Sequence, residues 1–348
     1  MTDRRIPTLD GMRAIAILIV LSAHASHLRF INGLGHMGVM IFFGISGYLI
    51  TSRLLDEYRT NGRISLRDFY LRRAFRILPP AVTYLAVVGL LTALGVVVCN
   101  VSAIWGALLF YVNYQDVAGM VGTAWRVGHF WSLSVEEHFY LIWPCLLIFF
   151  GVLAGWRTAA ALAVTLLLWR LGDNHFHIVS APYLHEQFYR TDLIADTLLW
   201  GCCLAFVKAR SNAVVSTGVA IVSAALLALM TMGISGKIGY LLQSMHFIPA
   251  VLLWAVVSCP AAPIGRFLEL APMRFIGNLS YSLYIWQQLF LGGQGQKLPV
   301  ILGVAAAFAG AYLSYRFIEQ PSIALGRGVV RRFRDGKRLA AAPQENPR

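Results

Sequence analysis

Long apolar runs recur along this chain from residue 12 to residue 318, and short polar connections separate them. A run of about 17 to 25 apolar residues is long enough to cross a bilayer as an α-helix. We therefore predict an all-α, polytopic membrane helix bundle with about ten transmembrane helices. The ten predicted spans are 12–30, 36–54, 76–98, 130–155, 157–172, 190–208, 213–232, 239–258, 274–291 and 298–318.

The apolar run 101–113 is shorter than these spans. A run of that length is too short to cross a bilayer, and we predict a re-entrant or interfacial segment there. Ten crossings with both termini in the cytoplasm put the arginine-rich connection 53–76 inside, as the positive-inside rule prefers. We expect residues 1–325 to form one membrane domain and residues 326–348 to form a basic, disordered cytoplasmic tail.

The composition excludes an ordinary soluble domain. Of the 348 residues, 58% are hydrophobic and 13% are charged, which is the balance of a polytopic membrane protein. The net charge of +13 comes from short connections and the C-terminal segment, so it indicates topology and not nucleic-acid binding. The five cysteines lie in or beside apolar runs without metal-ligand spacing, so we predict no metal site.

Two ionisable residues, Arg13 and His24, lie eleven positions apart in the first predicted span. At 1.5 Å and 100° per residue they share nearly the same helix face, about 16 Å apart along the axis. Ionisable groups at membrane depth are costly, so they are candidates for function. In the structural alternative, Arg13 anchors the helix at the interface and His24 hydrogen-bonds to a neighbouring helix. We favour the functional interpretation for His24.

Two adjacent carboxylates, Glu136 and Glu137, lie a couple of turns into the predicted span 130–155. They are costly there unless they meet a cation, a proton or a hydrogen-bond network. The predicted topology puts the start of this span level with the outer end of the first span, so His24 is the expected partner. In the structural alternative, one glutamate caps the helix and the other reaches the interface.

A basic cluster on the predicted cytoplasmic side consists of Arg72, Arg73 and Arg76, which precede Pro79 and Pro80. Two of these arginines are four residues apart and share a helix face, and we expect the proline pair to end or kink that helix. Guanidinium groups bind phosphate bidentately, so the cluster suits a phosphorylated ligand. The alternative is a plain stop signal for membrane insertion.

Short motifs in a recognisable order run from residue 5 to residue 325. They are Leu9, Asp10, Gly11, Arg13 and His24; Phe42, Phe43, Ser46 and Gly47; Arg72, Arg73 and Arg76; Trp131, Ser132, Leu133, Ser134, Val135, Glu136, Phe139, Tyr140, Trp143 and Pro144; Arg190, Asp192 and Gly201; Gly277, Ser280, Tyr281, Ser282, Tyr284 and Trp286; and Phe317, Ile318, Glu319 and Pro321. In these motifs the chain resembles the acyltransferase three family of bacterial integral membrane proteins, which transfer acyl groups, commonly acetyl, to sugar hydroxyls of surface polysaccharides and related glycoconjugates. It departs from the family at Gln287, where a histidine is common, and we expect a stand-alone form without the esterase-like domain of some relatives.

The resemblance implies a membrane-bound O-acyltransferase of the bacterial inner membrane that uses acetyl-CoA or another acyl-CoA as donor substrate and has no permanently bound cofactor. His24 would be the general base or the acyl acceptor, held by Glu136 or Glu137. Arg13 and the basic cluster would bind acyl-CoA. Supporting roles fall to Asp10, Ser134, Arg190, Asp192, Ser280, Tyr281, Ser282 and Glu319. The expected partners are acyl-CoA, a carbohydrate or glycolipid acceptor and membrane lipids.

The rival interpretation is a proton-coupled transporter or flippase, in which the same ionisable residues form a proton relay. Against it, the sequence has no obvious internal repeat with matched broken helices, which is the usual indication of alternating access. Within the enzyme interpretation, direct transfer and a covalent acyl-histidine both fit the residues.

Overall fold

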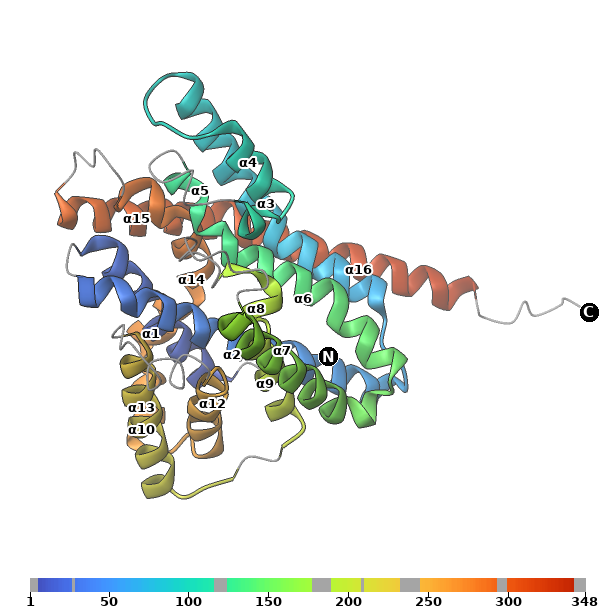
Figure 1. The fold of residues 1–348 in the computed structure, drawn as a ribbon. Helices are drawn as coiled ribbons and strands as arrows, with labels where there is room; N and C mark the ends of the chain where they lie inside the picture. Colours follow the sequence, from blue (N-terminus) through green and yellow to red (C-terminus); the bar gives the residue numbers. More distant parts are fainter. Residues whose placement is uncertain are drawn as a thin grey trace, which may run out of the picture.

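The computed structural model describes residues 6–26, 29–115, 124–176, 189–207, 210–231, 245–292 and 299–340. Within these ranges the regular elements are all helical and no strand is present, which confirms the all-α prediction (Figure 1). The helices are α1 (Pro7–Ala25), α2 (Arg29–Asn61), α3 (Leu66–Ala93), α4 (Val101–Leu108), α5 (Trp125–Gly128), α6 (Phe130–Phe149), α7 (Gly155–Phe176), α8 (Thr191–Ile194), α9 (Asp196–Ala205), α10 (Ala213–Thr231), α12 (Ile248–Ser258), α13 (Pro263–Leu268), α14 (Ala271–Phe290), α15 (Val300–Ser314) and α16 (Gln320–Ala340).

Six helical stretches of the described residues are long and apolar enough to cross a membrane, so the chain is a multi-pass membrane protein. They are Pro7–Ala25, Leu34–Asn61, Leu66–Ala93, Val152–Asp173, Ala213–Met230 and Val300–Asp335. Two shorter apolar helices, α9 and α12, fall inside the predicted spans 190–208 and 239–258. Each of the ten predicted ranges contains a helix, while the number of crossings and the side of the termini stay predictions.

The short segment 101–113 forms α4 and the first part of a 3-10 turn, Val112–Tyr114. The side chain of Asn100 caps α4 by accepting a hydrogen bond from the backbone N–H of Ser102. The apolar side chains of Trp105 and Leu109 are exposed. A short helix with exposed apolar residues agrees with the segment's length, and its interfacial or re-entrant position stays a prediction.

Helix α1 packs between α2 and α14, and α2 also packs along α9. Glycines make these approaches possible, because a Cβ on Gly277 would overlap the backbone oxygen of Asp10 and one on Gly47 would overlap that of Leu198. Small residues allow membrane helices to pack backbone to backbone. The two ends of α1 are therefore held in fixed relation to α14.

Helix α3 continues through Pro79 and Pro80 to Ala93, so of the two expected outcomes, an end or a kink, the end is wrong. Prolines are tolerated inside membrane helices where neighbouring groups hydrogen-bond to nearby backbone carbonyls. The hydroxyl of Tyr281, on α14, donates to the carbonyl of Ile77 at 2.7 Å. This contact ties α3 to α14 next to the proline pair.

The basic segment after residue 325 is helical as far as Ala340, which contradicts the expected disorder over that part, while residues 341–348 lie outside the described residues. A π-helical turn, Tyr315–Glu319, joins α15 to α16. Arg334 forms an ion pair with Asp68 of α3 at 2.7 Å, and the Arg67 guanidinium lies 4.6 Å from the centre of the Phe333 ring. These contacts hold α16 along α3.

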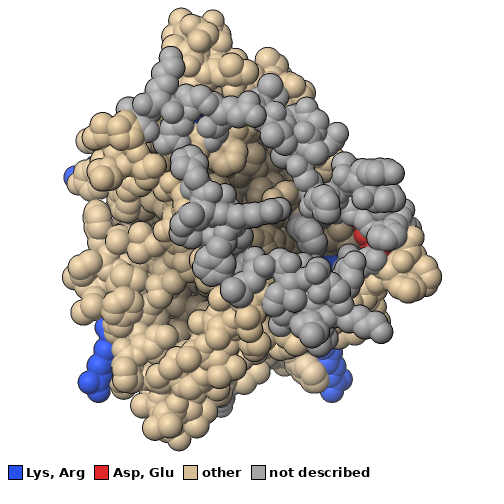
Figure 2. All heavy atoms as spheres, turned by 60° about the vertical axis from the view of Figure 1, so that its left-hand side comes forward, with Lys and Arg blue, Asp and Glu red and all other residues tan. Residues whose placement is uncertain are grey.

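The basic side chains are distributed unevenly over the surface. The face turned forward in Figure 2 shows few Lys or Arg side chains among its described atoms, and it is hollowed near its centre. Arginines are concentrated instead in α2, α3 and α16. The described surface therefore has a face poor in basic residues.

Candidate active site

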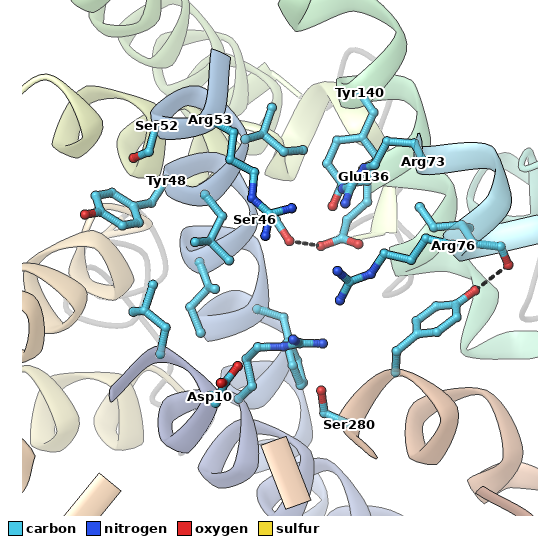
Figure 3. Close-up of a pocket in the computed structure, with 18 of the residues that line it drawn as sticks. Asp10, Ser46, Tyr48, Ser52, Arg53, Arg73, Arg76, Glu136, Tyr140 and Ser280 are labelled. Atoms are coloured by element: carbon cyan, nitrogen blue, oxygen red, sulfur yellow. Dashed lines mark hydrogen bonds between the residues drawn. The ribbon is translucent and has the colours of Figure 1, made fainter. Parts of the chain in front are cut away.

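A cavity of about 460 Å³ lies between α1, α2, α3, α6, α14 and the π-helical turn. Six arginines and four carboxylates line it, together with serine and tyrosine side chains (Figure 3). The charged lining residues are Asp10, Arg13, Arg53, Asp56, Arg59, Arg73, Arg76, Glu136, Glu319 and Arg327. The excess of arginine makes the cavity suitable for an anionic ligand.

The predicted arginines divide between the cavity and its surroundings. Arg13 lines the cavity from α1, a helix that begins with Pro7 in its first turn. Arg73 and Arg76 line it from α3, and the Arg73 guanidinium lies 3.5 Å from the centre of the Tyr140 ring. Arg72 is not among the lining residues, and it forms an ion pair with Glu57 at 3.2 Å. Arg72 therefore lies apart from Arg73 and Arg76, and its role in donor binding stays a prediction.

Ser46 and Arg53 on α2 complete this group. The Ser46 hydroxyl donates to Glu136 at 2.5 Å, and Arg53 and Arg76 point toward the same carboxylate (Figure 3). Glu137 is outside the lining, and its Oε1 atom is buried with no hydrogen-bond partner in the described ranges. Adjacent residues on a helix point about 100° apart, which explains why only one glutamate enters the cavity.

His24 lies near the other end of α1, half-buried and outside the cavity lining. Its Nδ1 atom lies 3.0 Å from Oε1 of Gln287, and its Nε2 atom lies 3.4 Å from Nε2 of Gln288. The Trp125 ring packs edge-on against the imidazole, with the ring centres 5.5 Å apart. The structure does not bring the predicted carboxylates to His24.

The reason lies in the depth of α6. His129, at the start of that helix, is the residue level with His24, and Glu136 follows seven residues later, about 10 Å along the helix. Glu136 is bonded to Ser46 instead. No hydrogen bond joins either glutamate to His24 in the part of the chain that the structure describes, so glutamines replace the expected carboxylate partner.

A layer of hydroxyl groups lies between the cavity and His24. Ser132 and Tyr284 line the cavity, with their hydroxyl oxygens 2.5 Å apart. The Tyr284 hydroxyl also donates to the backbone carbonyl of His129 at 2.7 Å. The His129 ring in turn lies 2.7 Å from Gln288, which contacts His24. A series of side-chain contacts therefore connects the cavity with the surroundings of His24.

The predicted supporting residues have different surroundings. Asp10, Ser280 and Tyr281 line the cavity, and Ser282 donates to Glu319 at 2.7 Å. The charges of Arg76 and Arg13 act on Glu319, which the π-helical turn directs into the cavity. Four of the five predicted residues of this end therefore line the cavity, and the fifth, Ser282, bonds to one of them; the five are Asp10, Ser280, Tyr281, Ser282 and Glu319.

The remaining supporting residues lie outside the cavity. Ser134 donates to the carbonyl of Phe130 within its own helix. Arg190 pairs with Asp192 at 3.1 Å, and Trp169 donates to the same carboxylate at 3.0 Å. None of Ser134, Arg190 and Asp192 is a lining residue, and their supporting role stays a prediction.

The structure adds residues that the sequence interpretation did not assign to the site. Arg53 and Ser46 join the cavity, and Gln287, Gln288 and His129 surround His24. The sequence marked two of these residues. Ser46 belongs to a family motif, and Gln287 stands where the family commonly has a histidine. Gln288 and His129 had no distinguishing pattern, because only the packing of α14 against α1 and α6 brings them to His24.

Three relatives have comparable similarity over most of the chain. The peptidoglycan O-acetyltransferase OatA of Listeria monocytogenes is 30% identical over 353 residues, covering 91% of this chain and 55% of that protein. YrhL of Bacillus subtilis, named provisionally as a peptidoglycan O-acetyltransferase, is 31% identical over 362 residues, with 91% and 55% covered. A Staphylococcus aureus protein named provisionally as an O-acetyltransferase is 30% identical over 361 residues, with 91% and 57% covered.

The chain spans about half the length of the curated relatives that it matches. No solved structure matches it. The model of a family described as an acyltransferase domain matches residues 6–316, which include the cavity residues up to Tyr315 together with His24 and its glutamine partners. The chain therefore belongs to the acyltransferase three family.

Proposed function

We propose that this chain transfers an acyl group, acetyl in the first instance, from cytoplasmic acyl-CoA to a sugar hydroxyl of a cell-surface polysaccharide or related glycoconjugate. The observation that carries the proposal is the arginine-lined cavity of about 460 Å³ inside a membrane acyltransferase domain. That volume is in the range of small-molecule sites, and guanidinium groups suit the phosphates of CoA. Family membership favours acyl transfer over the transporter alternative.

The proposed topology has about ten crossings in the bacterial inner membrane, with both termini and the arginine end of α1 on the cytoplasmic side. The basic residues of α2, α3 and α16 support this orientation through the positive-inside rule. His24 then lies toward the outer face, where polysaccharide is found. The name of the Listeria relative supports a peptidoglycan-type glycan as acceptor.

In the proposed reaction, Arg13, Arg73 and Arg76 bind the phosphates of the donor, and the pantetheine arm extends past the hydroxyl layer toward His24. Nε2 of His24 takes the proton of the sugar hydroxyl as its oxygen forms a bond to the acyl carbonyl carbon. The tetrahedral intermediate collapses, the carbon–sulfur bond breaks, and the thiolate of CoA takes the proton from His24. The products are an O-acyl sugar and free CoA.

A covalent variant of this route passes through an acyl-histidine. The test uses the full chain, purified in detergent, with acetyl-labelled acetyl-CoA and glycan fragments as acceptors. We expect label on the glycan and an equal amount of free CoA. Label that accumulates on the protein without acceptor, and disappears when acceptor is added, would identify the covalent route. Folded protein that transfers no label to any glycan fragment would contradict the proposed function.

A further inference from the structure

Two consecutive glutamines on α14 contact the two ring nitrogens of His24. Oε1 of Gln287 lies 3.0 Å from Nδ1, and Nε2 of Gln288 lies 3.4 Å from Nε2 of the histidine. Both glutamines are buried, with exposed fractions of 0% and 4%. A neutral imidazole has one nitrogen that donates and one that accepts, so the orientation of each amide decides which nitrogen is which.

The orientation of Gln288 is fixed from outside this group. The backbone N–H of His129 donates to its Oε1 atom at 3.2 Å. A backbone N–H can only donate, so the amide oxygen is the atom that suits this contact. Nδ1 of the His129 ring lies 2.7 Å from the same oxygen and Nε2 lies 3.0 Å from the carbonyl of Ile285, so this orientation gives the His129 ring a hydrogen on both nitrogens. The amide nitrogen of Gln288 therefore faces Nε2 of His24. Because an amide nitrogen can only donate, Nε2 of His24 bears no hydrogen and accepts this contact with its lone pair.

The orientation of Gln287 follows from that result. With the lone pair on Nε2, the hydrogen of neutral His24 is on Nδ1 and needs an acceptor, which Oε1 of Gln287 supplies. The opposite orientation would put amide donors against both nitrogens. Nε2 of Gln287 is buried with no hydrogen-bond partner among the described residues. Within that part of the chain, the hydrogen bond to His24 is thus the only one that explains the position of this side chain.

We propose that Gln287 and Gln288 are positioning residues that hold neutral His24 as its Nδ1–H tautomer and keep the Nε2 lone pair available to the acceptor hydroxyl. This inference rests on the proposed function, in which His24 is the base. The Gln288 contact at 3.4 Å is longer than a strong N–H···N hydrogen bond, so an incoming hydroxyl can replace it. The Gln287 contact at 3.0 Å is of ordinary strength and remains during the reaction.

Amides suit this role in a membrane interior. They accept a hydrogen bond without placing a second charge in a low-dielectric environment, where an unpaired charge is costly. They also leave the imidazole neutral, whereas a carboxylate next to the ring would favour its protonated form. A protonated ring cannot accept the proton of the sugar hydroxyl. The role expected for a glutamate is therefore performed by an uncharged side chain.

The test compares Gln287→Met, which keeps the length of the side chain but removes the oxygen, with Gln287→Glu, which keeps an oxygen acceptor. We expect Gln287→Met to lower kcat by about 10- to 100-fold, part of the contribution of a positioned general base. KM for acetyl-CoA should stay unchanged, because donor binding involves the other end of α1. Gln287→Glu keeps an acceptor for the Nδ1 hydrogen but favours the protonated ring, so its kcat should recover only as the pH is raised. Gln115→Met is the matched control, since Gln115 bonds to Ser102 away from His24.

His24→Ala is measured in parallel to separate two failures. If His24→Ala keeps its activity, the proposed role of His24 is wrong. If His24→Ala is inactive while Gln287→Met keeps a normal kcat, only the positioning role is wrong. A Gln287→Glu variant whose kcat has the same pH dependence as that of the wild type would also overturn it, because the carboxylate should favour the protonated ring.

A second measurement needs no glutamine variant. In protein labelled with ¹⁵N-histidine, the resonances of His24 are identified by their loss in His24→Ala, and their shifts report which nitrogen bears the hydrogen. We expect hydrogen on Nδ1 and a lone pair on Nε2. The opposite assignment would overturn the inference, even if Gln287→Met fails to fold.

Discussion

At one end of α1, Arg13 lies among arginines and carboxylates. At the other end, about 16 Å away, His24 is held by uncharged amides. Arg13, Arg73 and Arg76 share a cavity with carboxylates that offset part of their charge. The partners of His24 among the described side chains, Gln287, Gln288 and Trp125, are neutral polar and aromatic groups. Under the proposed function, the difference means that donor capture and proton transfer have different surroundings on one helix. Four predictions test how far the two regions are separate.

The largest effect is expected from His24→Ala, which should abolish transfer while leaving donor binding intact. Loss of a general base lowers a rate by about 10² to 10⁴, and His24 is outside the cavity lining. The measurements are kcat from labelled acetyl-CoA and CoA affinity by calorimetry on the same preparation. If the variant loses CoA affinity in parallel with kcat, the two regions act as one site.

The double substitution Arg73→Ala with Arg76→Ala should weaken CoA binding by about 10-fold or more, because the loss of even one hydrogen bond to a charged group costs about 1.5–3 kcal/mol. The loss should shrink as salt rises, since most of the lost interaction is electrostatic. Arg72→Ala is the control, because Arg72 is bound to Glu57 outside the cavity. Equal losses in the control and the double variant would mean that the arginines act only through general surface charge.

Gly277→Val tests whether α1 and α14 work as one rigid pair. The added side chain would overlap the backbone of Asp10, and overpacking of this kind costs about 1–3 kcal/mol. We expect a lower unfolding temperature in detergent and reduced values of both kcat and CoA affinity. Gly218→Val is the control, since a Cβ there meets open space. A change in only one of the two activities would show that the ends of α1 move independently.

The smallest effect is expected from Arg334→Ala, which removes the ion pair between α16 and Asp68. Arg334 is 41% exposed, so the contribution is at most about 1 kcal/mol, and Asp68 keeps Arg67 at 3.3 Å. Hydrogen exchange in α16 should become faster while transfer at His24 stays normal. Arg331→Ala, whose pairing with Asp335 is exposed, should leave α16 unchanged. Slower transfer in the Arg334 variant would show that the position of α16 affects the reaction.

The sequence predicted the helices better than their side-chain contacts. Apolar runs determine helices in a membrane, so every predicted span contains one. A one-dimensional pattern gives the face and depth of a residue but not the rotation of the neighbouring helix, which is why Glu136 was expected at His24 and lies at Ser46. Gln287 was noticed only as a departure from the family. The continued α16 depends on distant partners such as Asp68, which no local pattern shows.

The hydroxyl layer formed by Ser132 and Tyr284 has a consequence for the cell as a whole. A protein with polar regions toward both faces of a membrane would dissipate the proton gradient if water filled the space between them. Ser132 and Tyr284 are hydrogen-bonded to each other, and Tyr284 to the carbonyl of His129, where such a column would have to run. Hydrogen bonds of this kind contribute about 1 kcal/mol each, so under the proposed function a slender substrate arm can separate them during turnover. The proposed function then combines passage of a long thioester with electrical insulation of the membrane.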